Sequence, residues 1–212
     1  MTRDSIIDWP LNQCVSSIQW NTKVHYDIPF QLQGLQDKAN NCLEKGLFTD
    51  AVLHAQMAVQ ISTDTFGYDH LYVAVSHNKL GLSYSKKREC DKAIKCYEKA
   101  LKINIHILGA NHAWVGSIYN NLGSAYNTKG QHDVAITYHE QSLQIRIHIF
   151  GIHHVDVAAS YHNLGTAYSR KGVYDKAIEY YEQSLQMKKQ LFKGEKQTAC
   201  KYYEEAWKIY NV

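Results

Sequence analysis

The chain repeats itself with a period of 42 residues, and this repetition constrains its fold more than any other feature of the sequence. The motif Leu-Gly-x-Ala-Tyr at residues 122–126 returns at residues 164–168, and a close variant stands at residues 80–84. Identical residues fill 18 of 32 aligned positions between 119–150 and 161–192. Counted without gaps, four copies are predicted at residues 35–76, 77–118, 119–160 and 161–202.

Within each copy the pattern predicts a helix, a turn and a second helix. Leu122 and Tyr126 are four residues apart and therefore lie on one face of a helix. Gly130 supplies the turn, and Gly151 ends the second helix. The glycine of each Leu-Gly motif costs about 1 kcal/mol in a helix interior, so we expect it to allow close approach of the second helix. No proline follows Pro29, and the sequence therefore predicts an all-α protein.

A single helix hairpin cannot bury its apolar face alone, so the copies are expected to stack into an α-solenoid. First helices would line the inner surface of the stack and second helices the outer one. The last residues, 203–212, contain Trp207 and are predicted to form a C-terminal capping helix. Residues 1–34 form an N-terminal segment with Trp9 and Trp20. This segment either docks on the first repeat or marks a domain boundary.

The order of the repeated residues is that of a known family. A Leu-Gly-x-x-Tyr motif is followed by a turn glycine and by Ala-Ile-x-x-Tyr, and the hairpins are joined by Phe-Gly-x-x-His-x-x-Val, as at residues 150–157. This pattern resembles the tetratricopeptide repeat, and the long period resembles the 42-residue repeats of kinesin light chains and nephrocystin-like proteins. The resemblance implies a right-handed superhelix that serves as a non-enzymatic protein–protein interaction module, an adaptor or scaffold.

The chain departs from a kinesin light chain in two respects. No heptad coiled coil precedes the repeats, so binding to a kinesin heavy chain in that family's way is not expected. In the fourth copy an extra Lys193 stands before Gly194, and the His-x-x-Val linker is lost.

The sequence carries no signature of catalysis or of a cofactor: no GxGxxG, no GxxxxGK[ST], no HExxH and no EF-hand loop. We therefore expect no enzyme, no catalytic residue, no cofactor, no metal site and no small-molecule substrate. Among 12 histidines, His70, His112 and His154 occupy one column of the repeat, which predicts a structural role in the linkers. Five scattered cysteines without a CxxC pair predict reduced thiols.

Composition bounds the partners and the compartment. No run of 18 apolar residues and no secretory apolar region occurs, which predicts a cytoplasmic protein without a membrane partner. The net charge of +3 is too small to indicate nucleic acid. Extra lysines on the predicted second helices could contact RNA or an acidic membrane, but a solvated face explains them more simply.

The predicted inner surface is the candidate binding site. Projecting the first helices of the second to fourth copies points eighteen residues inward, and none is acidic, whereas Lys79, Lys86 and Arg170 are cationic. Asn121 and Asn163 are expected side by side about 10 Å apart, where they would hold the backbone of an extended or short helical peptide, possibly an acidic one. The residues predicted to bind are Asn78, Lys79, Lys86, Asn120, Asn121, Ser124, Asn127, His162, Asn163, Thr166 and Arg170.

Other interpretations remain open at this point. The inner surface could be a solvated polar face, and the repeats could form a structural spacer or a self-association surface within a larger protein. We expect a monomer with a free groove. His139 stands where the neighbouring copies have Tyr97 and Tyr181, so we expect a packing position and a gain in stability of about 1 kcal/mol from His139→Tyr.

Overall fold

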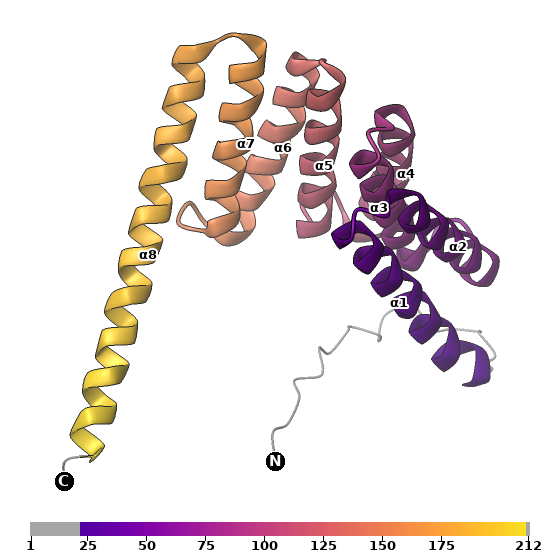
Figure 1. Ribbon diagram of the computed structural model, residues 1–212, viewed down its shortest axis with the longest axis horizontal. Coiled ribbons are helices and arrows are strands. Elements are labelled where there is room, and N and C mark those ends of the chain that lie inside the picture. The colour runs from indigo at the N-terminus through magenta and orange to yellow at the C-terminus, as the bar shows by residue number, and fades with distance from the viewer. Residues whose placement is uncertain (1–21, 211–212) are drawn as a thin grey trace.

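The computed structural model describes the backbone of residues 22–210 and the side chains of residues 27–193. This part of the chain contains eight α-helices and no strand (Figure 1). The predicted all-α class is thereby confirmed. The helices are α1 (Thr22–Glu44), α2 (Phe48–Phe66), α3 (Leu71–Lys86), α4 (Cys90–Leu108), α5 (Ala113–Lys129), α6 (His132–Phe150), α7 (Val155–Lys171) and α8 (Tyr174–Tyr210).

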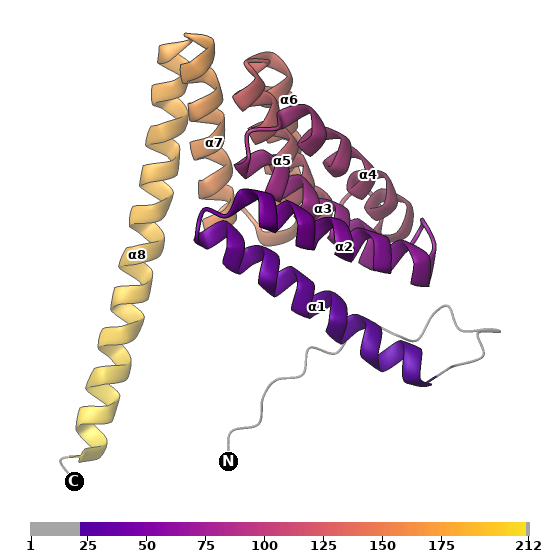
Figure 2. The same ribbon diagram turned by 45° about the vertical axis from the view of Figure 1, so that its right-hand side comes forward.

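The helices pack as a stack of four hairpins, each made of a first helix and a second helix. Each helix contacts the next one along the chain, and the first helices α1, α3, α5 and α7 also contact one another in sequence (Figures 1 and 2). Within the described residues, the second helices of neighbouring hairpins do not contact each other. In a curved stack the elements that approach one another lie on the inside, so the first helices form the concave side. The α-solenoid predicted from the sequence is confirmed.

Three histidines begin the first helices. The Nδ1 atoms of His70, His112 and His154 accept hydrogen bonds of 3.2, 3.2 and 3.1 Å from the backbone N–H two residues further on. Each residue therefore caps α3, α5 or α7. The structural role predicted for this column of histidines is confirmed. The copies counted from the sequence begin six residues after these helices begin, inside the first helix of each hairpin.

Close approach of the two helices in a hairpin explains the glycines of the Leu-Gly motifs. A Cβ atom on Gly81, Gly123 or Gly165 would lie 2.6–2.8 Å from a ring atom of the second helix. The second helices can pack this tightly only because these positions carry no side chain.

Neighbouring hairpins are held together by the leucine of the same motif. Leu122 clusters with Ile94 of α4, and Leu164 clusters with Ile136 of α6. Leu122 and Leu164 are fully buried. Each hairpin thus depends on its neighbours for most of its apolar burial, as expected for stacked repeats.

The C-terminal end differs from the prediction. Residues 203–210 do not form a separate capping helix, because α8 runs without a break for 37 residues from Tyr174 to Tyr210. The physical reason lies in the fourth copy, which lacks the histidine cap and places Lys193 before the glycine that would end the helix. Residues 211–212 lie outside the described residues.

At the N-terminal end, residues 22–34 of the predicted N-terminal segment belong to α1, which also contains Pro29. The predicted docking of Trp9 and Trp20 lies outside the described residues. In the described part of the chain, no helix is both long enough and apolar enough to cross a membrane.

Candidate functional site

Each first helix exposes one stripe of side chains on the concave side. In α5 the exposed residues Ser117, Ser124 and Thr128 alternate with the half-buried Asn120 and Asn121, at the spacing of one helix face. The same positions on the other first helices follow from the 42-residue period. We call the following set the concave surface: Gln33, Asp37, Asn40, Glu44, Val75, Asn78, Lys79, Leu82, Lys86, Ser117, Asn120, Asn121, Ser124, Thr128, Ala159, His162, Asn163, Thr166 and Arg170.

Four of the predicted asparagines form two hydrogen-bonded pairs between neighbouring first helices. The Nδ2 atom of Asn121 donates to Oδ1 of Asn78 at 3.0 Å, and Nδ2 of Asn163 donates to Oδ1 of Asn120 at 2.7 Å. We call these the two amide pairs. Asn121 and Asn163 therefore each reach back to the preceding hairpin, a relationship that the projection of single helices did not contain.

The amide pairs leave polar groups on the concave surface. Each pair uses one N–H and one carbonyl oxygen, whereas two primary amides together offer four N–H donors and two carbonyl oxygens. Asn78 and Asn120 retain their own Nδ2 groups, and Asn121 and Asn163 retain their own Oδ1 atoms, for a ligand to meet. Both pairs are only partly buried, so a ligand can reach them.

The hydroxyl groups of α5 form a neutral floor beside the amide pairs. Ser117, Ser124 and Thr128 donate to the backbone carbonyls of Ala113, Asn120 and Ser124 at 3.1, 3.0 and 2.9 Å. Because these bonds remain within the helix, the side chains support no contact between helices. On α7, Thr166 donates to the carbonyl of His162 at 3.0 Å.

Asn127 is not part of the concave surface, although the sequence placed it there. Its side chain is 6% exposed, and its Oδ1 atom lies 2.7 Å from Nδ1 of His132 at the start of α6. The residue closes the turn of its own hairpin, because it lies one position past Tyr126 on the side that faces α6. Its backbone carbonyl accepts a bond of 3.4 Å from Nη1 of Arg170.

The concave surface is charged at both ends and neutral at α5. Lys79 is half-buried, and Lys86 and Arg170 are exposed, as the sequence analysis required of attracting cations. The first hairpin adds two exposed carboxylates, Asp37 and Glu44, that the sequence analysis missed. The signal was present, because these residues stand 42 positions before Lys79 and Lys86.

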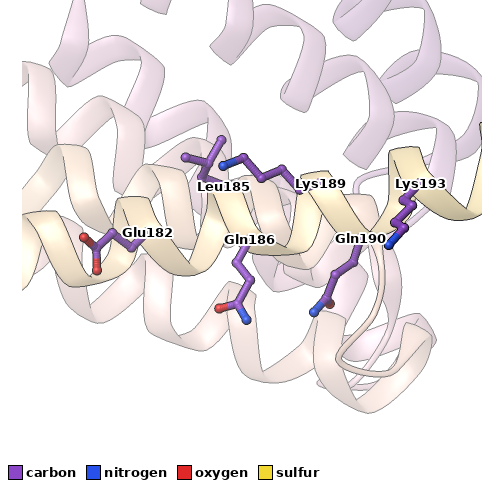
Figure 3. Close-up of a pocket in the computed structure, with 6 residues that line it drawn as sticks. All are labelled: Glu182, Leu185, Gln186, Lys189, Gln190 and Lys193. Carbon is purple, nitrogen blue, oxygen red and sulfur yellow. The ribbon is translucent and has the colours of Figure 1, made fainter.

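No alternative site appears in the described side chains. They contain no group of three His, Cys, Asp or Glu residues that could hold a metal ion. A shallow hollow of about 370 Å³ runs along α8, lined by Glu182, Leu185, Gln186, Lys189, Gln190 and Lys193 (Figure 3). Another of about 310 Å³ lies where α2, α3 and α4 meet, around Gln56 and Tyr84. Neither hollow belongs to the concave surface.

Comparison with known proteins identifies the repeat. The family model described as tetratricopeptide repeat matches residues 31–105, 72–147 and 114–190. No curated protein matches the chain in sequence.

Among solved structures, BtubC (BKLC) from P. vanneervenii has a TM-score of 0.70 at 24% identity, covering 78% of this chain and 66% of its own. The chain thus spans somewhat less than two thirds of that protein's length. Nearly identical TPR-like repeats of a Podospora anserina protein described as a kinesin light chain give a TM-score of 0.68 at 24% identity, covering 76% of this chain and 77% of that one. MamA gives 0.55 at 23% identity, covering 81% and 86%. At these identities the likeness concerns the fold alone.

Proposed function

Since the chain belongs to the tetratricopeptide repeat family, which generally supplies protein-interaction modules, we propose that it binds a segment of a partner protein along the concave surface. It acts as an adaptor or scaffold of the kinesin light chain-like kind, as a monomer in the cytoplasm and without catalysis. The single observation that carries the proposal is the pair of amide pairs, which present donors and acceptors at equivalent places in successive hairpins.

This spacing suits an extended peptide backbone. Packed helix layers repeat at about 10 Å, and an extended chain advances about 3.4 Å per residue. One amide pair would therefore meet the ligand every three residues, with an N–H from Asn78 or Asn120 for its carbonyls. Recognition of backbone groups makes binding tolerant of the ligand's sequence, and the flanking charges would supply selection.

Charge favours an acidic ligand over α3 to α7. Lys79, Lys86 and Arg170 would attract carboxylates there, whereas Asp37 and Glu44 on α1 would repel them. The acidic part of the ligand is thus expected beyond α1 in the stack. Binding should weaken as salt rises, because these charges are at the surface.

Peptides selected from a random library on the wild-type protein test the proposal. Ser124→Tyr places a neutral, bulky side chain between the two amide pairs and removes no contact between helices. Thr137→Tyr is its matched control, because Thr137 is exposed on the second helix α6 and its hydroxyl makes the same bond to the carbonyl four residues earlier, at 3.2 Å.

We expect the selected peptides to lose at least tenfold in affinity for the Ser124→Tyr variant and to keep their affinity for the Thr137→Tyr variant. Equal binding to both variants would show that the ligand lies elsewhere, and the basic second helices would then be the first place to search. Light scattering separates a monomeric adaptor from a self-associating spacer.

A further inference from the structure

The last helix exposes an apolar face that every earlier hairpin covers. Ile178 of α8 is 56% exposed, whereas its counterparts Val52, Ile94 and Ile136 are 6–7% exposed. Those three pack beneath the first helix of the following hairpin, and Ile136 clusters with Leu164, Ala167 and Tyr168 of α7. Among the described helices, α8 contacts only α7.

The exposed face continues along α8. Leu185, two turns further on, is 53% exposed, and it lines the shallow hollow of that helix together with Glu182 and Lys189. Leu185 and Lys189 lie on the same side of α8 in Figure 3. We call Ile178, Glu182, Leu185 and Lys189 the terminal face. It occupies the place where the next first helix would lie.

The sequence after residue 195 has the pattern of such a first helix. Counted at the same 42-residue offset, Lys201, Glu204, Glu205 and Lys208 fall at the positions of Ala159, His162, Asn163 and Thr166, which belong to the concave surface. Tyr202, Ala206, Ile209 and Tyr210 fall at the positions of Ser160, Leu164, Ala167 and Tyr168, which are buried toward α6. Polar and apolar residues are thus separated as a stacked helix requires.

One departure from the motif fits the same interpretation. Trp207 stands at the position of Gly165, whose role is to admit Tyr181 of its own second helix. A terminal helix without a second helix of its own needs no glycine there.

The chain also carries a weak point where a fold-back would begin. The second helices α2, α4 and α6 end at Phe66, Leu108 and Phe150, each followed by a glycine with positive φ. In α8 the equivalent Phe192 is followed by Lys193 and Gly194, and the helix continues straight past α7 (Figures 1 and 2). Glycine is the residue least suited to the interior of an exposed helix, apart from proline.

We infer that α8 breaks at Gly194 and that residues 196–210 fold back onto the terminal face, as the last first helix of the stack. The straight helix is then the open form, and the folded-back segment is the closed form that covers Ile178 and Leu185. In the closed form Glu204 and Glu205 occupy the concave positions of His162 and Asn163, one hairpin further on.

A distance between two labels separates the two forms. Spin labels on unnatural amino acids at Tyr174 and Lys208, read by pulsed dipolar spectroscopy, avoid the native cysteines. In a straight helix the two positions are about 51 Å apart, at 1.5 Å per residue. In the closed form they are within about 20 Å, because packed helix axes are 8–10 Å apart. We expect the short distance to dominate in the wild-type chain.

Two charged substitutions and one control complete the experiment. Ile178→Glu with Leu185→Glu should abolish the short distance and restore the long one. Leu53→Glu, at an exposed apolar residue of α2 with 54% exposure, should leave the short distance in place.

A wild-type chain with only the long distance overturns the inference, whether or not the charged variant folds. A short distance that appears between differently labelled chains and fades on dilution also overturns it, since a second copy would then cover the terminal face.

Discussion

The ring of His139 lies against Gly123: a Cβ atom on that glycine would be 2.7 Å from Cε1 of the imidazole. Tyr97 meets Gly81 and Tyr181 meets Gly165 in the same way, so one ring of the second helix fills the same notch in three hairpins. The predicted packing role of His139 is confirmed, since its side chain is 2% exposed.

His139→Tyr should stabilise the protein. The Nδ1 atom of His139 is buried without a hydrogen-bond partner among the described residues, which costs free energy in the folded state. In the neighbouring hairpin, the Tyr181 hydroxyl donates to Thr166 at 3.2 Å, and Ser124 stands at the equivalent position for a tyrosine at 139. We expect the free energy of unfolding to rise by about 1 kcal/mol in urea titrations. A fall in melting temperature would contradict this account of the notch.

Acid should destabilise the protein through the same residue. Burial, followed by the charge of Arg146, lowers the pKa of His139 from 6.5 to about 4. The unfolded state then binds a proton below pH 6.5 that the folded state refuses, so this contribution to stability is complete above pH 6.5 and is lost as the pH falls toward 4.

At pH 4.5 the loss from this residue should be about 2 kcal/mol relative to pH 7.5. Urea titrations at the two pH values measure it, and His139→Tyr should remove that part of the difference. His77, whose pKa burial also lowers to about 4, should keep some pH dependence in the variant. An unchanged pH dependence in His139→Tyr would exclude His139 as its source.

Arg88→Gly should also stabilise the chain. Arg88 closes the turn between α3 and α4 with φ of 65°, where the other hairpins have Gly46, Gly130 and Gly172. A side chain in the left-handed region costs about 1–2 kcal/mol, and glycine gives part of that back as entropy of the unfolded chain. We expect a net gain of about 1 kcal/mol, measured by thermal unfolding. The reciprocal Gly130→Arg should lose a similar amount; if both variants melt like wild type, the turn is not strained.

Removing an amide pair should weaken the stack as well as any ligand binding. Asn121→Ala deletes the bond to Asn78 and leaves a partly buried carbonyl oxygen, so unfolding should become easier by about 1 kcal/mol. A double-mutant cycle with Asn78→Ala measures the coupling, which should be at least 0.5 kcal/mol. Additive losses would mean that the two amides do not interact in solution. Because of this structural share, Ser124→Tyr is the cleaner test of the groove.

Features that recur with the period could be predicted from the sequence, and features that occur once could not. The cap made by His112 and the notch at Gly123 each appear in several copies, so one reason explains all of them. Asn127 is different: its burial depends on His132, which stands where the other hairpins have Cys90 and Tyr174. A projection from the repeat could not reveal a pair that exists in one hairpin.

The amide pairs show where a single-helix projection ends. Each pair joins residues 43 apart, one more than the period, because the neighbouring first helix is displaced along its axis. The sequence gives both residue types at those positions, but the displacement is a property of two packed helices. The acidic residues of α1 were missed for a simpler reason, since the first copy is too degenerate to align by its motif.

Contact between first helices, and its absence between second helices in the described part of the array, decides how this molecule deforms under load. Neighbouring hairpins can rock about the line of first helices with little change in their spacing there, while the outer ends of the second helices swing through the largest arc. The array is therefore a spring whose stiff edge is the inner one, tied at intervals by amide bonds. A change in its pitch is felt most at the lysine-rich outer rim, far from whatever is held inside.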